Sequence, residues 1–314
     1  MMAFKIRDNL LDSLPNVEGH IEENASLAKY TWFRTGGPAE ILFKPKNKSD
    51  LQNFMNGCPK NIPLTFVGVG SNMIIRDGGI EGVVIKLGKS FSNIKVEEEY
   101  IIAEAGAMDV TVSSEAQKLG LAGLEFLRGI PGTIGGTVKM NGGAYGSEVS
   151  DRLVSAKILS RDGIVKTILA SEFGFSYRKT SLTKDDIILE ATFKCEKSNS
   201  KNIQARMDEI MAARESTQPL RTRTGGSTFK NPDVKLSGGK KAWQLIDDSG
   251  CRGLTLGGAK VSEKHCNFLI NTGKASSKNI EDLGLEVKRK VLDKTGVVLE
   301  WEISLVGQKC GSQK

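Results

Sequence analysis

The stretch Leu119–Gly146, LGLAGLEFLRGIPGTIGGTVKMNGGAYG, contains nine glycines among its twenty-eight residues. Low-complexity linkers are also rich in glycine, but they lack apolar residues. In this stretch leucine, isoleucine, phenylalanine, valine and methionine alternate with the glycines. Because glycine lets a backbone turn tightly and approach a ligand closely, the pattern predicts ordered chain packed against a bound molecule. A cofactor is the first candidate.

A second glycine turn, Gly68–Asn72 (GVGSN), follows an apolar segment that we predict to be a strand. It does not match the dinucleotide fingerprint G-x-G-x-x-G, because Met73 occupies the third glycine position and another strand follows instead of a helix. Residues Gly82–Ser90 also fail to match a phosphate-binding P-loop. Five residues separate Gly82 from the Gly88-Lys89 pair, whereas the motif requires four. We therefore reject both motifs.

Taken alone, Gly68–Asn72 would be an ordinary turn between strands. It does offer a run of backbone N–H groups, with the side chains of Ser71 and Asn72, and such a nest can bind a pyrophosphate without a helix. Together with the loops Gly129–Gly136 and Met140–Gly146, it suits one extended dinucleotide. The predicted cofactor-binding residues are Gly68, Gly70, Ser71, Asn72, Gly129, Gly132, Thr133, Gly135, Gly136 and Gly142.

The chain has 314 residues, a formal net charge of +7 and five cysteines. This length allows two or three domains. The charge permits a nucleic-acid binder or an enzyme for anionic small molecules, and lysines dispersed among acids favour the enzyme. The scattered cysteines predict no metal site. Because we find no long apolar run and no signal-peptide pattern, we expect a cytoplasmic protein that is not in the membrane.

Hydrophobic periodicity predicts a mixed α+β order in three parts. We expect strands at residues 39–45, 64–75 (interrupted by the glycine turn), 82–87, 100–107, 153–160, 163–169, 186–195, 267–271 and 299–307. We expect helices at residues 48–58, 108–121, 201–219, 241–250 and 280–296. Ser49 or Asp50 is the predicted N-cap of the first helix.

Arg221–Pro232, RTRTGGSTFKNP, places Ser227 behind two glycines. A nucleophilic serine normally needs a histidine beside it, and the chain has only His20 and His265. The ordinary role of a serine after two glycines is turn formation. The sequence therefore poses the question of what an exposed serine does without a dedicated base.

A resemblance in six motifs suggests a role for Ser227. VGVGSNMIIRDGGIEGVVIKL, GLEFLRGIPGTIGGTVKMNGGAYG, FSYRKTSL, GGSTFKNP, HCNFLIN and LEWEISLVG occur in the order seen in UDP-N-acetylenolpyruvoylglucosamine reductases. The chain resembles this family from about residue 30 to residue 307. Its compact C-terminal segment resembles the shorter subclass.

The resemblance implies an FAD-binding fold of the vanillyl-alcohol-oxidase type in two sub-domains, residues 30–98 and 99–199. An N-terminal extension (residues 1–29) would precede them, and a linker helix with an α+β substrate domain (residues 200–314) would follow. It also implies non-covalent FAD, NADPH as hydride donor and UDP-N-acetylglucosamine enolpyruvate as substrate. The oligomeric state stays open.

The resemblance gives three residues a catalytic role. Ser227 would protonate the intermediate formed by hydride transfer, Arg178 would bind the substrate carboxylate, and Glu302 would hydrogen-bond or donate to the same carboxylate. By strand alternation Glu300 and Glu302 face one side, and the motif register favours Glu302. Without the resemblance, each of the three would be an ordinary surface or turn residue. The implied substrate-binding residues are Tyr177, Lys230 and Asn231, with weaker support for Arg221 and Arg223.

Two alternatives remain open at this stage. An FAD oxidase of the same fold class acting on a sugar or alcohol would share the glycine loops. Such enzymes often link the flavin to histidine or cysteine, which the glycine loops here lack. A nucleic-acid-binding protein would need basic and aromatic residues interleaved on one face, and this sequence does not supply them.

Overall fold

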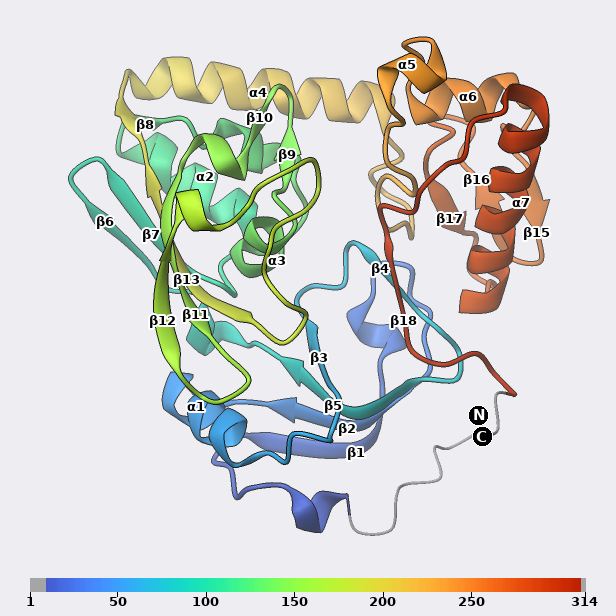
Figure 1. Ribbon diagram of the computed structural model, residues 1–314. Helices are drawn as coiled ribbons and strands as arrows, with labels where there is room; N and C mark the ends of the chain where they lie inside the picture. Colours follow the sequence, from blue (N-terminus) through green and yellow to red (C-terminus); the bar gives the residue numbers. More distant parts are fainter. Residues whose placement is uncertain (1–9, 312–314) are drawn as a thin grey trace.

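The computed structural model describes residues 10–311, which form two larger sheets and a C-terminal unit (Figure 1). One long helix connects the second of these sheets to the C-terminal unit. The first sheet has the order β1-β2-β5-β3, with β1 antiparallel to β2 and the other neighbours parallel. Its strands are β1 (His20–Ser26), β2 (Pro38–Lys44), β3 (Leu64–Val67) and β5 (Ile80–Lys86). The helix α1 (Lys48–Gly57) packs on this sheet through Leu51, Phe54 and Met55.

Two details of this region differ from the prediction. The N-cap of α1 is Asn47, whose side chain accepts from Asp50 N, so the prediction of Ser49 or Asp50 was wrong. Asp50 instead lies buried and accepts from the backbone N–H groups of Glu18, Gly19 and Lys46. Strand β1 falls within the segment that we expected to be an N-terminal extension, and it pairs with β2 along its length.

The second sheet is antiparallel throughout, with the order β12-β11-β13-β7-β6. Its strands are β6 (Ile94–Glu97), β7 (Tyr100–Glu104), β11 (Leu153–Leu159), β12 (Val165–Leu169) and β13 (Ile187–Lys194). The helices α2 (Asp109–Lys118) and α3 (Ile134–Lys139) share its hydrophobic core. We had predicted Gly129–Gly136 as a loop, but Gly135 and Gly136 lie in the first turn of α3.

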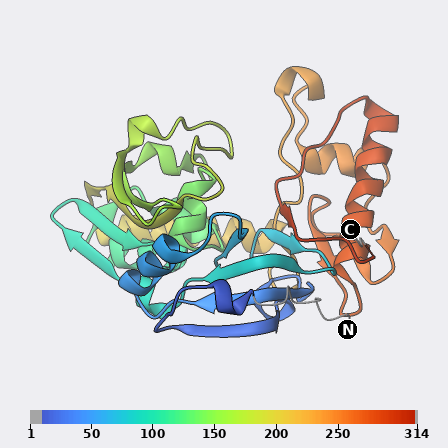
Figure 2. The same cartoon turned by 60° about the horizontal axis from the view of Figure 1, so that its bottom comes forward.

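Helix α4 (Ser200–Thr217) runs from the second sheet to the C-terminal unit, as both views show (Figures 1 and 2). That unit packs α6 (Ala242–Asp248) and α7 (Ser277–Thr295) around a core that includes Leu245, Leu283 and Val287. Its remaining elements are α5 (Val234–Ser237), β15 (Thr255–Leu256), β16 (Ala259–Val261) and β17 (Leu269–Asn271). The short strands elsewhere are β8 (Leu121–Ala122), β9 (Gly143–Ala144), β10 (Ser147–Glu148) and β14 (Glu196–Lys197).

The chain end returns to the first half of the molecule. Strand β18 (Ser304–Val306) pairs in parallel with β4 (Met73–Ile75). We had predicted a strand over residues 299–307, but residues 299–303 form only an isolated bridge between Trp301 and Phe229.

Charged side chains also hold the C-terminal unit to the segment that follows β4. The guanidinium of Arg76 donates to both carboxylate oxygens of Glu281 in α7, at 2.9 and 3.0 Å. The carboxylate of Asp77 accepts from the first backbone N–H groups of α7, which stabilises the helix end. The C-terminal unit is therefore anchored directly to the β4 segment.

Candidate active site

The segment Ser227–Asn231 lies between two other segments of the C-terminal unit. Asn267 binds it on one side, because its side chain accepts from Phe229 N at 3.0 Å and donates to Phe229 O at 2.8 Å. On the other side Glu302 N donates to Thr228 O at 2.9 Å. These bonds hold the backbone of the segment in an extended course, with Phe229 buried and Ser227 half-buried.

The two glycines ahead of Ser227 serve different purposes. A Cβ at Gly225 would lie 2.5 Å from the ring of Phe33, so only glycine fits against that buried side chain. Gly226 has a φ of +80°, which L residues rarely adopt, and no atom lies within 4 Å of an added Cβ. The first glycine therefore allows close packing and the second allows the turn that presents Ser227.

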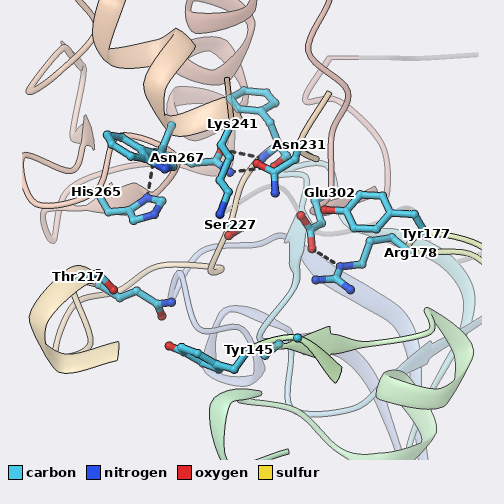
Figure 3. A pocket seen from close by; sticks show the side chains of 15 residues that line it. Tyr145, Tyr177, Arg178, Thr217, Ser227, Asn231, Lys241, His265, Asn267 and Glu302 are labelled. Atoms are coloured by element: carbon cyan, nitrogen blue, oxygen red, sulfur yellow. Dashed lines mark hydrogen bonds and ion pairs between the residues drawn. The ribbon is translucent and has the colours of Figure 1, made fainter. Parts of the chain in front are cut away.

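Ser227 opens onto a cavity of about 440 Å³, which we call the serine cavity; its wall includes Tyr145, Tyr177, Arg178, Ser227, Asn231, Lys241, His265 and Glu302 (Figure 3). Within residues 10–311, no group forms a hydrogen bond with the hydroxyl of Ser227. The hydroxyl therefore has its donor and acceptor capacity available to a bound molecule.

Arg178 and Glu302 face one another in this cavity (Figure 3). The Nε of Arg178 donates to Glu302 Oε1 at 2.8 Å, and the two side chains are 18% and 13% exposed. Arg178 Nη2 also donates to the backbone oxygen of Gly143 at 2.8 Å. The guanidinium is thereby fixed in orientation, with part of its donor fork already engaged.

The backbone at Arg178 is unusual. Its φ is +56°, in the left-handed region that disfavours side chains, and it sits in a tight turn closed by two hydrogen bonds between Ser176 and Lys179. Residues held in this region cost on the order of 1 kcal/mol and cluster at functional sites. The turn directs the guanidinium toward Glu302, so the strain coincides with the ion pair.

Burial raises the pKa of the Glu302 carboxyl above its ordinary value, and the positive charge of Arg178 opposes this shift. The backbone of this residue is held too, because Glu302 O accepts from Asn72 Nδ2 at 3.3 Å. Asn72 therefore contacts the C-terminal segment through its side chain. Because the two effects on the carboxyl oppose one another, a change in the charge near Arg178 changes the pKa of Glu302.

The other predicted substrate residues take different positions. Tyr177 and Asn231 lie in the wall of the serine cavity, Tyr177 with its ring 5.0 Å from the guanidinium of Arg178. Lys230 lies outside that wall, and its ammonium pairs with Glu300 at 3.2 Å. The Glu300 side chain is 72% exposed and lies outside the wall of the serine cavity, whereas Glu302 lies in that wall. Arg221 and Arg223 are exposed outside the wall.

Sequence reasoning missed several residues of this wall. Tyr145 comes from the glycine-rich stretch, and burial raises the pKa of its phenol. Lys241 stands at the start of α6, and His265 packs between Trp243 and Phe268, where burial lowers the pKa of the imidazole. The only sign of Tyr145 in the sequence was its place in the loop Met140–Gly146, which we predicted to bind a cofactor.

A further cavity of about 440 Å³ lies between the two sheets, and we call it the inter-sheet cavity. Its wall comes from the ends of β3 and β5, from the segment after β7, and from α3 and the start of β13. Four of the ten predicted cofactor residues lie in it: Gly68, Thr133, Gly135 and Gly136. The six that lie outside it are Gly70, Ser71, Asn72, Gly129, Gly132 and Gly142.

Glycines outside the wall have packing reasons of their own. A Cβ at Gly70 would lie 2.1 Å from Tyr30 O, and one at Gly132 would lie 2.7 Å from the carboxylate of Asp109. Gly136, in contrast, lines the inter-sheet cavity and has no atom within 4 Å of an added Cβ. Bare backbone thus faces the cavity at Gly136, as close approach of a ligand requires.

Comparison with known proteins agrees with this geometry. Residues 218–306 match the model of the UDP-N-acetylenolpyruvoylglucosamine reductase C-terminal domain, and residues 39–168 match an FAD binding domain. The UDP-N-acetylenolpyruvoylglucosamine reductase of Parvibaculum lavamentivorans is 52% identical over 98% of this chain and 97% of its own. That of Rhodospirillum rubrum is 49% identical over 98% and 96%.

The chain belongs to the UDP-N-acetylenolpyruvoylglucosamine reductase family. It is therefore an oxidoreductase with an FAD-binding domain, as the resemblance implied, and the expected fold class is confirmed. The crystal structure of UDP-N-acetylenolpyruvylglucosamine reductase from Thermus caldophilus superimposes with a TM-score of 0.78 at 32% identity, covering 93% of this chain and 100% of that one. The 6-hydroxy-D-nicotine oxidase of Arthrobacter nicotinovorans shares the fold alone, with a TM-score of 0.54 at 10% identity.

The residues of this reductase fit FAD. The inter-sheet cavity combines apolar side chains such as Phe66 and Ile187 with the bare backbone of Gly136 and the hydroxyl of Thr133. Mostly apolar walls with a few placed polar groups are typical of cofactor sites. Among residues 10–311, no cluster of three or more His, Cys, Asp or Glu side chains is arranged to hold a metal ion. In the same described range, no helix is both long enough and apolar enough to cross a membrane.

Proposed function

We propose that the protein reduces UDP-N-acetylglucosamine enolpyruvate to UDP-N-acetylmuramate, with NADPH as the hydride donor, in peptidoglycan precursor synthesis in the cytoplasm. The observation that supports this proposal is the shared cavity of Ser227, Arg178 and Glu302. These three residues come from distant parts of the chain, and a free hydroxyl, a fixed cation and a buried carboxyl are what the reaction requires. FAD held in the inter-sheet cavity would supply the hydride-transfer chemistry between NADPH and the enolpyruvyl double bond.

Ser227 acts as the proton donor in this proposal. Addition of hydride to the terminal carbon leaves negative charge on the adjacent carbon, which bears the substrate carboxylate. This adjacent carbon must then take up a proton. A strongly basic intermediate needs no histidine to activate the serine, which answers the question raised by the sequence. The free hydroxyl of Ser227 has no competing partner in residues 10–311 that would hold its proton elsewhere.

Arg178 and Glu302 stabilise the developing charge. The guanidinium of Arg178 binds the substrate carboxylate with the part of its fork that Glu302 and Gly143 leave available. As negative charge grows next to Glu302, its raised pKa favours the protonated form, which donates a hydrogen bond to the same carboxylate. A preorganised site of this kind needs little rearrangement during the reaction.

The rest of the serine cavity suits an anionic nucleotide sugar. Lys241 contributes a cation, Asn231 an amide, and Tyr145 and Tyr177 aromatic rings with hydroxyls. We assign Tyr177 and Asn231 to substrate binding. We also assign Lys230 to binding of the UDP diphosphate. This requires that its ion pair with the exposed side chain of Glu300 opens when the substrate binds.

The test is spectroscopic. The purified protein should show a flavin absorption spectrum, and acid precipitation should release the flavin, because it is not covalently attached. Without oxygen, NADPH should bleach this spectrum, and UDP-N-acetylglucosamine enolpyruvate should restore it with formation of UDP-N-acetylmuramate.

The other outcomes discriminate between functions. If a sugar or alcohol bleached the flavin absorption, and only oxygen restored it, the protein would be an oxidase of the same fold and not a reductase. A colourless protein that cannot be reconstituted with FAD would contradict both.

A further inference from the structure

Two lysines of the inter-sheet cavity have their ammonium groups bonded to backbone carbonyls and form no ion pair within residues 10–311. Lys86, at the end of β5, donates from its ammonium to Gly68 O at 2.7 Å. Lys139, at the end of α3, donates to Asp186 O at 2.8 Å and to Lys184 O at 3.1 Å. Each ammonium is thus held by backbone carbonyls at the cavity wall. The two lysines belong to different halves of the molecule and reach the cavity from its two sides.

Neither lysine forms an ion pair with any carboxylate of residues 10–311. Other lysines of the same region do: Lys48 lies 2.8 Å from Glu104, and Lys157 lies 2.9 Å from Glu190. Burial lowers the pKa of both cavity lysines. At Lys139 the negative charges of Asp186 and Asp185 oppose this shift but do not cancel it, whereas at Lys86 no anion opposes it. A half-buried, unpaired ammonium is costly unless an anion joins it.

More positive charge lies behind Lys86. The ammonium groups of Lys29, Lys44 and Lys86 surround the ring of Tyr30 at 5.1, 5.2 and 5.3 Å from its centroid. The charge of Lys44 lowers the pKa of Lys86 further. The cation–π contacts offset only part of this repulsion. Lys29 is paired with Glu22 at 3.8 Å, so the repulsion at this side of the cavity is mainly between Lys44 and Lys86, and a bound anion would relieve it.

We propose that Lys86 and Lys139 bind the diphosphate of FAD from opposite sides of the inter-sheet cavity. The proposal rests on FAD as the cofactor of this protein. It assigns a second task to Lys86, which holds the Gly68 turn through the carbonyl that its ammonium contacts. The backbone N–H groups of the glycine turns then need not neutralise two phosphate charges alone.

The experiment compares flavins that differ in phosphate content. The full-length protein is stripped of flavin, and the dissociation constants of FAD and riboflavin are measured by fluorescence at several salt concentrations. The variants are Lys86→Met and Lys139→Met. The matched control is Lys95→Met, because Lys95 is an exposed lysine of β6 outside the cavity wall.

We expect each variant to weaken FAD binding about tenfold, the effect of one lost charge-assisted contact, and to flatten its salt dependence. Riboflavin binding by the two variants, and FAD binding by the Lys95→Met protein, should stay within about twofold of wild type. Lys86→Arg and Lys139→Arg should recover most of the FAD affinity, which separates charge from packing.

Three results would overturn the proposal. One is an equal loss of FAD and riboflavin affinity in Lys86→Met and Lys139→Met, which would indicate damage to cavity shape. Another is an unchanged FAD affinity in both, and the third is a loss of FAD affinity in Lys95→Met as large as theirs. A wild-type protein that binds neither flavin would instead contradict FAD as the cofactor, so the two failures are distinguishable.

Discussion

Arg178 and Glu302 are 124 positions apart in the sequence, yet Arg178 Nε donates to Glu302 Oε1 at 2.8 Å inside the serine cavity. The cation that we assign to the substrate carboxylate therefore already has a carboxylate partner. A second carboxylate in the same place would repel Glu302 and raise its pKa further, beyond the effect of burial. Binding of the substrate should then be coupled to uptake of a proton by Glu302.

The variant Glu302→Gln tests this coupling. In wild type, affinity for the enolpyruvyl substrate should fall as pH rises through the raised pKa of Glu302, because the ionised carboxylate competes for Arg178. The glutamine side chain of the variant keeps an oxygen acceptor for Arg178 but carries no charge, so the dependence on pH should disappear. Titration calorimetry in buffers of different ionisation enthalpy measures the proton uptake directly. A wild-type protein that takes up no proton on binding would contradict the coupling.

Ser227→Ala should separate the two half-reactions. Reduction of the flavin by NADPH should proceed as in wild type, because no proton donation to carbon is involved. Reoxidation by the enolpyruvyl substrate should slow by about 10²- to 10⁴-fold, the usual contribution of a general acid. Stopped-flow absorbance follows both steps. Ser304→Ala, at an exposed serine of β18, is the matched control. Equal slowing of both half-reactions would make Ser227 a structural residue.

The sequence predicted most elements of the fold, because their apolar periodicity is strong and local. It did not predict β1, whose sequence HIEENAS is mostly polar and becomes a strand only by pairing with β2. The N-cap of α1 was wrong for a similar reason. Asp50 resembles a cap by type, but its carboxylate is used by three backbone N–H groups that the sequence could not place nearby.

The sequence indicated candidate site residues only where they lie in motifs that resemble the family. Ser227, Arg178 and Glu302 were predicted through the family resemblance, and all three lie in the wall of the serine cavity. Lys86 was not found, because a lysine at the end of an apolar strand gives no sign of the carbonyl that it will contact. At Gly70 and Gly132 the structure adds a reason for glycine that the sequence does not show, because an added Cβ would meet Tyr30 O or the carboxylate of Asp109.

Gly135 and Gly136 are adjacent in α3 but should respond differently to alanine. A Cβ at Gly135 would lie 2.8 Å from Ala105 Cβ, so Gly135→Ala should destabilise the protein by about 1–3 kcal/mol. A Cβ at Gly136 meets no atom within 4 Å, so Gly136→Ala should stabilise the flavin-free protein by about 0.5–1 kcal/mol through helix propensity.

The same Gly136→Ala change should weaken FAD binding, because its methyl group enters the inter-sheet cavity. Urea unfolding measures the first effect and flavin fluorescence the second. If Gly136→Ala bound FAD as tightly as wild type, the cofactor would not approach this backbone.

Asp109 should make stability depend on pH. Its carboxyl is fully buried at the start of α2, and Thr137 Oγ1 donates to Oδ2 at 2.6 Å, while Oδ1 has no partner among the described residues. Burial raises the pKa of Asp109 to about 8. Because the folded-state pKa exceeds the ordinary value of 3.8, the folded protein holds this proton more tightly. The contribution to stability is complete below about pH 4 and is lost as pH rises through about 8.

Asp109→Asn removes the titration and keeps the acceptor for Thr137. The melting temperature of wild type should therefore fall more steeply than that of Asp109→Asn between about pH 4 and 8. The variant should be less stable at the acidic end, because its amide places an unpaired donor in a buried position. Asp208→Asn, at an exposed residue of α4, should leave the slope of wild type unchanged. Parallel melting curves for wild type and Asp109→Asn would mean that Asp109 is already ionised in the folded protein, with an unseen partner for its charge.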